Sequence, residues 1–166
     1  MKTITEMKQE KNLAFDKKNY LVNAKQYINQ KPVRSVSEAI QSEAPSLANL
    51  TKKTSVDDVE KLIASFIVDI NYHLNVKNPM TAEHISLASQ LIYDEFYNLK
   101  LSDLYLISRR IISGQYGEFY NTLSTPKLLL IFRNYFNERC DMAADLSKSK
   151  HESFKNDLEN YKIKKL

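Results

Sequence analysis

Glycine is scarce in this chain, whose 166 residues include only two, Gly114 and Gly117. β-sandwiches, Rossmann units and P-loops need glycine in tight turns or in the loops that wrap phosphate groups, so these folds are not expected. The hydrophobic share of 43% is nevertheless large enough to form a core. At this length we expect one compact domain with tails.

Cysteine and long apolar runs are also lacking. A single cysteine, Cys140, excludes an internal disulfide and is typical of a reducing compartment, so we expect a cytoplasmic protein. Residues 1–18 are charged throughout and contain no apolar stretch of the kind found in secretion signals. The longest continuous apolar run, residues 128–132, is far shorter than the roughly 20 residues that a bilayer requires. Neither a secreted nor a membrane-spanning protein is expected.

The small net charge of +4 is unevenly distributed. Residues 1–34 carry eight Lys and Arg against three acids, and residues 148–166 carry six against three. Residues 35–147 carry ten against fourteen, so an acidic middle lies between two basic arms. This layout favours an anionic partner contacted by the arms, such as nucleic acid or an acidic protein surface. The alternative is that the arms only keep the chain soluble.

The spacing of apolar residues predicts helices throughout. Ser55, Thr81 and Thr125 each precede residues with apolar positions three and four apart, and no segment alternates with period two. Ser35 with Glu38 predicts a short helix through residue 40, and residues 42–55 are predicted to be a linker or an ordered loop. We therefore expect an all-α fold, a small bundle of about four core helices with an extra N-terminal helix and basic tails.

Three regions follow from this pattern. Residues 1–50 are predicted to be a basic N-terminal arm with one or two short helices, one of them amphipathic over residues 20–28. Residues 51–147 are predicted to be the bundle core. Residues 148–166 are predicted to be a basic helical extension or tail.

The most specific local feature is the sequence RRIISGQYGEFY, residues 109–120. Gly114 is placed to end the third core helix and Gly117 to reverse the chain, so that the nearby aromatic rings cover the end of the core. Arginine and tyrosine are also frequent anchors of interfaces, so the same turn could bind a partner. The candidate partner-binding residues are Arg109, Arg110, Gln115, Tyr116 and Tyr120.

Residues suited to catalysis or metal binding are few. The three histidines lie in different segments, and Asp69 with His73 is the one pair at helical spacing, which favours a local hydrogen bond over a metal site. Cys140 falls on the apolar stripe of its helix and is expected to be a buried small hydrophobe. We therefore expect no metal, no cofactor and no enzymatic activity. Convergence of Asp69, His73, His84 or Cys140 in one pocket would argue for an enzyme.

A tyrosine-rich helix within residues 81–139 is followed by a recognisable series of positions. These are Leu101, Asp103, Leu104, Arg109, Arg110, Gly114, Tyr116, Gly117, Tyr135 and Arg139. On these residues the segment resembles an uncharacterised family of small helical proteins from phages and mobile elements of gut Bacteroidota, a family without an assigned activity. In outline, a bundle with a charged arm also looks like the helicase-loader or loader-inhibitor proteins of phage replication.

The leading functional prediction is a non-enzymatic helical adaptor of phage or mobile-element origin that binds a protein partner. The likeness to helicase loaders implies a role in DNA replication, in the cytoplasm of the host cell if the chain is phage-encoded. Two alternatives stay open: a nucleic-acid-binding protein whose arms contact phosphates, and a structural phage protein whose tails become ordered on assembly.

Overall fold

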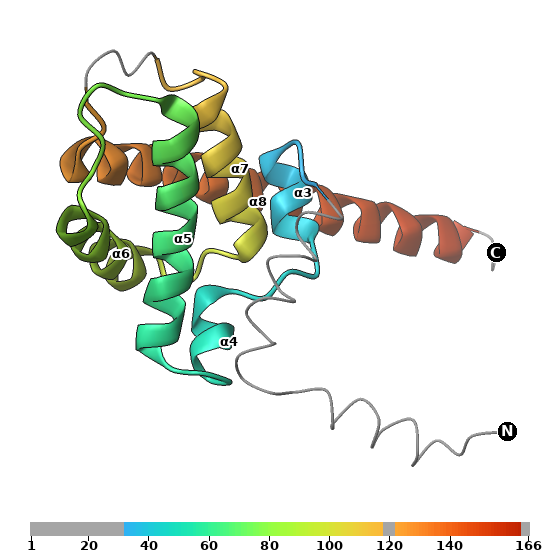
Figure 1. Ribbon diagram of the computed structural model, residues 1–166. Coiled ribbons are helices and arrows are strands. Elements are labelled where there is room, and N and C mark those ends of the chain that lie inside the picture. Colours follow the sequence, from blue (N-terminus) through green and yellow to red (C-terminus); the bar gives the residue numbers. More distant parts are fainter. Residues whose placement is uncertain (1–31, 118–121, 164–166) are drawn as a thin grey trace, which may run out of the picture.

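The computed structural model describes residues 32–117 and 122–163, with side chains up to residue 155. These residues form six helices and no β-strand, which confirms the predicted all-α bundle (Figure 1). The helices are α3 (Val36–Gln41), α4 (Leu47–Thr51), α5 (Val56–Leu74), α6 (Ala82–Phe96), α7 (Leu101–Ile112) and α8 (Thr125–Ile163). The helix predicted over residues 20–28 lies outside the described residues.

Polar side chains start the core helices as their positions in the sequence predict. The hydroxyl of Ser55 accepts a hydrogen bond from the backbone N–H of Asp58 at 3.1 Å, and Thr81 does the same for His84 at 3.4 Å. Each hydroxyl therefore satisfies one of the backbone N–H groups of the first helical turn, which have no carbonyl partner within the helix. At its other end α5 stops at Asn75, whose left-handed φ of 47° cannot continue the helix.

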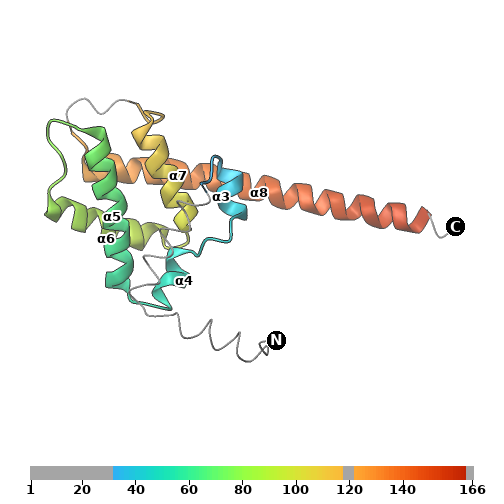
Figure 2. The same cartoon turned by 45° about the vertical axis from the view of Figure 1, so that its right-hand side comes forward.

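The core lies where α5, α6, α7 and the first half of α8 meet (Figure 2). The largest fully buried aliphatic residues of these helices are Ile63, Ile67, Ile70, Ile92, Leu101, Leu104 and Ile107. The ring of Phe96 packs against Phe132 and Phe136 of α8, with centroids 5.7 and 5.6 Å apart. Burial of these side chains is the main source of the bundle's stability.

The segment predicted to be a linker or ordered loop contains α4. Leu47 and Leu50 of this short helix are completely buried. The backbone N–H groups of Leu47 and Ala48 donate to the carbonyl oxygens of Leu99 and Tyr97, at 2.8 and 2.9 Å. Contacts with residues fifty positions later therefore stabilise α4, and a local pattern does not reveal them.

The core also includes α3, which the sequence assigns to the N-terminal arm. Val36 and Ala39 are buried, and the Lys100 ammonium donates to the carbonyl oxygens of Ile40 and Ser42, both at 2.7 Å. A lysine at this position satisfies carbonyl groups at the end of α3 that have no partner within the helix. The core of the described residues therefore extends at least as far back as α3, within the region predicted to be an arm.

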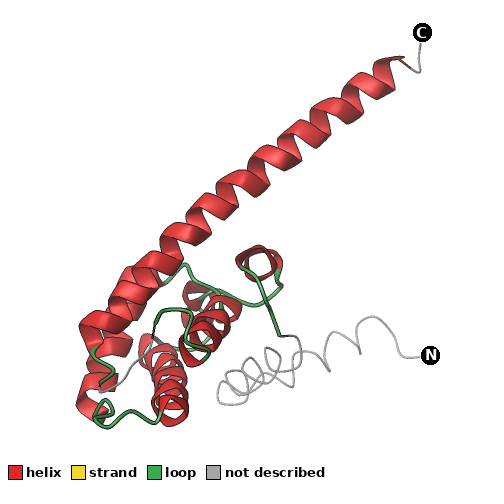
Figure 3. Cartoon of the chain, turned by 90° about the horizontal axis from the view of Figure 1, so that it is seen from above, coloured by secondary structure: helices red, strands yellow, loops and turns green. Residues whose placement is uncertain are grey.

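The last helix, α8, extends well past the bundle (Figures 2 and 3). Its 39 residues correspond to about 58 Å at 1.5 Å per residue. The described side chains of residues 147–155 are all exposed, including Phe154 at 62%. The helix continues to Ile163 through the region for which a basic helical extension or tail is predicted. No helix among the described residues is long and apolar enough to cross a membrane.

The prediction that Cys140 is buried is wrong, because its thiol is exposed. Tyr135 and Arg139 hold the positions of α8 that face α7, and both are bonded to Asp103 there. Cys140 follows Arg139 directly and is rotated by about 100° around the helix. That rotation places it on the solvent side.

Candidate functional site

The turn after α7 confirms the structural role predicted for Gly114. This residue has a φ of 79°, its N–H donates to the Ile111 carbonyl at 3.1 Å, and the N–H of Gln115 donates to the Arg110 carbonyl at 2.9 Å. The pair of hydrogen bonds is a Schellman motif, which needs a left-handed residue just beyond the helix. Gly117 also has a positive φ, of 85°. Both glycines therefore adopt a positive φ, which glycine tolerates because it has no side chain.

Arg110 points into the contact between α7 and α8. Its guanidinium donates to both carboxylate oxygens of Glu138, at 2.6 and 3.1 Å, and lies 5.5 Å from the centroid of the Tyr135 ring. Only 17% of the Arg110 side chain is exposed. The hydrogen bond to Glu138 raises the pKa of Arg110, so the group stays charged. Arg110 therefore joins two helices of the bundle.

Tyr116 lies next to Arg110 and is half-buried against the core. Burial raises the pKa of its hydroxyl, and the charge of the Arg110 guanidinium partly opposes that rise. Its hydroxyl oxygen finds no hydrogen-bond partner among the described residues. The ring therefore closes the end of the bundle beneath the glycine turn, as the structural interpretation of this turn predicts.

At the other end of α7, in its first turn, lies a buried polar cluster centred on Asp103, which is fully buried. Its carboxylate accepts hydrogen bonds from the Tyr135 hydroxyl at 2.7 Å, from Nε of Arg139 at 3.0 Å and from the backbone N–H of Lys100 at 2.7 Å. Burial is the largest cause of the raised pKa of Tyr135, and the charge of Asp103 adds to it. Tyr135 connects this cluster to Arg110 and Tyr116 nearer the turn, because its hydroxyl is bonded to Asp103 and its ring lies beneath the Arg110 guanidinium.

Arg109 is arranged differently from the other arginines of α7 and α8. It is exposed, and its guanidinium carbon lies 5.8 Å from the centroid of the Tyr105 ring, one turn earlier on α7. Arg110, Arg133 and Arg139 each bind a carboxylate, of Glu138, Glu95 and Asp103 respectively. The only contact described for Arg109 is with the face of the Tyr105 ring, and no ion pair to an acid of the bundle is described for it.

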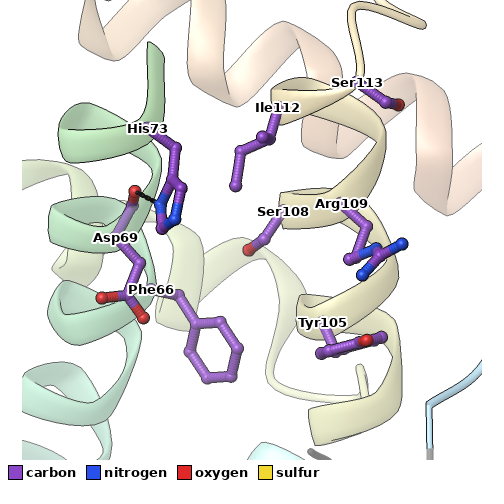
Figure 4. Close-up of a pocket in the computed structure, with 8 residues that line it drawn as sticks. All are labelled: Phe66, Asp69, His73, Tyr105, Ser108, Arg109, Ile112 and Ser113. Atoms are coloured by element: carbon purple, nitrogen blue, oxygen red, sulfur yellow. Dashed lines mark hydrogen bonds between the residues drawn. The ribbon is translucent and has the colours of Figure 1, made fainter. Parts of the chain in front are cut away.

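A pocket of about 370 Å³ opens beside Arg109, between α5 and α7 (Figure 4). Phe66 and His73 lie on the α5 side, and Ser108 and Ile112 on the α7 side (Figure 4). Asp69, Tyr105, Arg109 and Ser113 complete the lining. Apolar side chains therefore form much of a concave site, which also carries the guanidinium of Arg109, the carboxylate of Asp69 and the imidazole of His73.

Two polar side chains of this pocket, His73 and Ser108, bond to backbone carbonyl groups. His73 Nδ1 lies 2.7 Å from the Asp69 carbonyl oxygen, and the Ser108 hydroxyl donates to the Leu104 carbonyl at 2.8 Å. His84 lines another groove, between α6 and the start of α8, and Cys140 is on the outside of α8. Of the four residues whose convergence would argue for an enzyme, Asp69 and His73 line this pocket, and His84 and Cys140 lie elsewhere. The described residues contain no group of three or more side chains placed to hold a metal ion.

The predicted partner-binding residues thus separate into different places. Arg109 lines the pocket, Arg110 and Tyr116 pack inward, Gln115 is exposed on the turn, and Tyr120 lies outside the described residues. Tyr105 and Ile112 also line the pocket, although neither was predicted as a site residue. The signal for Tyr105 is its spacing, since a residue four positions before Arg109 shares its helix face.

Comparisons with protein-family models, curated proteins and solved structures find no match to this chain. Function must therefore be inferred from the geometry of the site itself.

Proposed function

We propose that this chain is a non-enzymatic helical adaptor that binds another protein at the pocket between α5 and α7. The observation that carries the proposal is Arg109, an exposed guanidinium stacked on Tyr105 beside a concave apolar site. Arginine and tyrosine anchors around a pocket are typical of the energetic centre of protein interfaces.

The state of the pocket's polar groups supports binding over catalysis. A serine nucleophile needs a base that accepts its proton, whereas Ser108 donates to a backbone carbonyl. The His73 ring is likewise held by the backbone carbonyl of Asp69. These contacts orient the side chains that line the pocket, and none of them links the His73 imidazole to the Ser108 hydroxyl.

Nucleic-acid binding through the arms is the second candidate, and the exposed lysines of the α8 extension favour it. Lys148, Lys150 and Lys155 are all exposed on this helix. Neutralisation of phosphates would make affinity fall steeply with salt concentration. The acidic charge of residues 35–147 favours a protein partner at the bundle itself. A phage or mobile-element origin, a role in replication and a role as a structural phage protein stay predictions.

The experiment is a selection of short random displayed peptides on the immobilised full chain, followed by affinity measurement of the bound peptides. We expect saturable binding that Arg109→Ala weakens by about tenfold or more, as for an interface anchor. The matched control is Arg133→Ala, because Arg133 is also exposed but pairs with Glu95 in another groove. Failure to select any peptide, or equal binding by the Arg109→Ala chain, would overturn the proposed function.

Single-stranded DNA and RNA oligonucleotides provide the competing measurement. If they bind the full chain at physiological salt and occupy the same site as the peptides, the nucleic-acid candidate replaces the adaptor. We expect them to bind only at low salt and to leave peptide binding unchanged.

A further inference from the structure

We infer that the pocket between α5 and α7 selects an acidic, hydrophobic segment of its partner, with one apolar side chain in the pocket and a neighbouring carboxylate on Arg109. This inference assumes the proposed function and specifies the chemistry of the partner at the same site.

The apolar half of the ligand follows from the lining of the pocket. Phe66 is 7% exposed and lies deep in the wall, while Ile112 is 37% exposed and lies closer to the surface. The ring of Tyr105 is partly buried and forms part of the same lining. A volume of about 370 Å³ can hold one leucine or one aromatic side chain. Burying such a side chain against these residues would contribute roughly 25 cal/mol for each Å² of apolar surface removed from water.

The acidic half of the ligand follows from Arg109. A guanidinium stacked on an aromatic ring still presents N–H donors at its edge, in a planar fork that matches two carboxylate oxygens. Three other arginines of this chain bind carboxylates within the bundle, two of them through two hydrogen bonds each. Among the four arginines of α7 and α8, Arg109 is the one for which no ion pair is described. Charge complementarity therefore points to a carboxylate from outside the bundle.

The opposite wall fixes the direction in which such a segment would lie. Asp69 and His73 line the α5 side, across the pocket from the α7 residues (Figure 4). Arg109 is the one lysine or arginine among the described residues of the lining, whereas the α5 side carries a carboxylate and an imidazole. The acid of the ligand is therefore expected on the α7 side, at Arg109, with its apolar side chain between the two helices.

The test is the sequence bias of the displayed peptides that the full chain selects. We expect aspartate or glutamate close to phenylalanine, tyrosine, leucine or isoleucine. A chain carrying Arg109→Glu should instead select lysine or arginine next to the same apolar residues, and it should bind the original peptides at least about tenfold more weakly. Ile112→Ser should weaken both sets of peptides, because it removes apolar lining without changing charge.

The outcomes separate this inference from the proposed function. If Arg109-dependent peptides are selected but show no acidic bias, or if Arg109→Glu selects the same acidic peptides, the inferred chemistry is wrong and the adaptor function stands. If acidic peptides bind but Ile112→Ser leaves their affinity unchanged, the apolar part of the inference is wrong. If no peptide is selected, both fail. Circular dichroism and thermal melting of each variant show that the chain is folded in every comparison.

Discussion

At the scale of single residues, the Asp103 carboxylate is the most consequential group of the bundle. It is fully buried yet accepts three hydrogen bonds, one of them from a positively charged partner, Arg139. A buried charge is tolerated only when its lone pairs are satisfied in this way. The cluster also joins the first turn of α7 to the middle of α8, so its loss would affect both helices.

Replacing Asp103 with asparagine tests this description. The change removes the negative charge and leaves Arg139, whose side chain is 16% exposed, without its partner. We expect a loss of about 3–5 kcal/mol in the free energy of unfolding, measured by urea denaturation. The matched control is Glu95→Gln, which breaks the more exposed ion pair with Arg133 and should cost much less, because water screens that pair. Similar losses in both variants would contradict the central role of Asp103.

Tyr135 gives the bundle a sensitivity to alkaline pH. Because burial and Asp103 raise its pKa in the folded state, the unfolded chain loses the phenolic proton first, at the ordinary value of about 10. The stabilising effect of the neutral hydroxyl is therefore complete below that pH and is lost as the pH rises above it. Relative to Tyr135→Phe, the native chain should lose about 1.4 kcal/mol more per pH unit above pH 10, as measured by urea denaturation at stepped pH. Equal slopes for the two chains would contradict this.

At the scale of elements, the turn after α7 depends on backbone conformation and not on packing. A Cβ atom at Gly114 would meet nothing within 4 Å, but the φ of 79° is unfavourable for a residue with a side chain. Gly114→Ala should therefore lower the free energy of unfolding by about 1–2 kcal/mol. Gly114→Asn should cost less, because asparagine tolerates the left-handed region. Thermal or urea unfolding of the two variants measures their relative stability. An asparagine variant less stable than the alanine variant would contradict this explanation.

The elements differ in how far the sequence predicts them. Ser55 and Thr81 start helices in any context because the cap is a local interaction, and they were predicted correctly. The short α4 depends on carbonyl groups at positions 97 and 99, which no local pattern connects to it. The candidate site likewise combines local features with contacts between residues that are far apart in the sequence. Arg109 lines the pocket, whereas Arg110 binds Glu138, which is 28 residues away in the sequence and is not connected to it by any local pattern.

At the scale of the whole molecule, the bundle and the free part of α8 are expected to behave independently. Truncation after residue 147 removes a segment whose described side chains, up to residue 155, are all exposed. Surface changes of this kind usually alter stability by about 0.5 kcal/mol or less. The melting temperature of the truncated chain should therefore stay close to that of the full chain in differential scanning calorimetry. A large fall would show that the extension packs against the bundle.

Two adjacent arginines have separate roles in this molecule. Arg110 holds Glu138 and covers the Tyr135 ring, so it stabilises the fold, whereas Arg109 is exposed beside the pocket. The two side chains leave α7 about 100° apart, which is why neighbours in sequence face different surroundings.

The most direct test is the affinity of one selected acidic peptide for the full chain and for its Arg109→Ala and Arg110→Ala variants, by isothermal titration calorimetry below the melting temperature of each. The predicted result is a loss of about tenfold or more for Arg109→Ala and a change of less than about threefold for Arg110→Ala. Equal losses in the two variants, or a loss confined to Arg110→Ala, would contradict the assignment of binding to Arg109 and of structural support to Arg110.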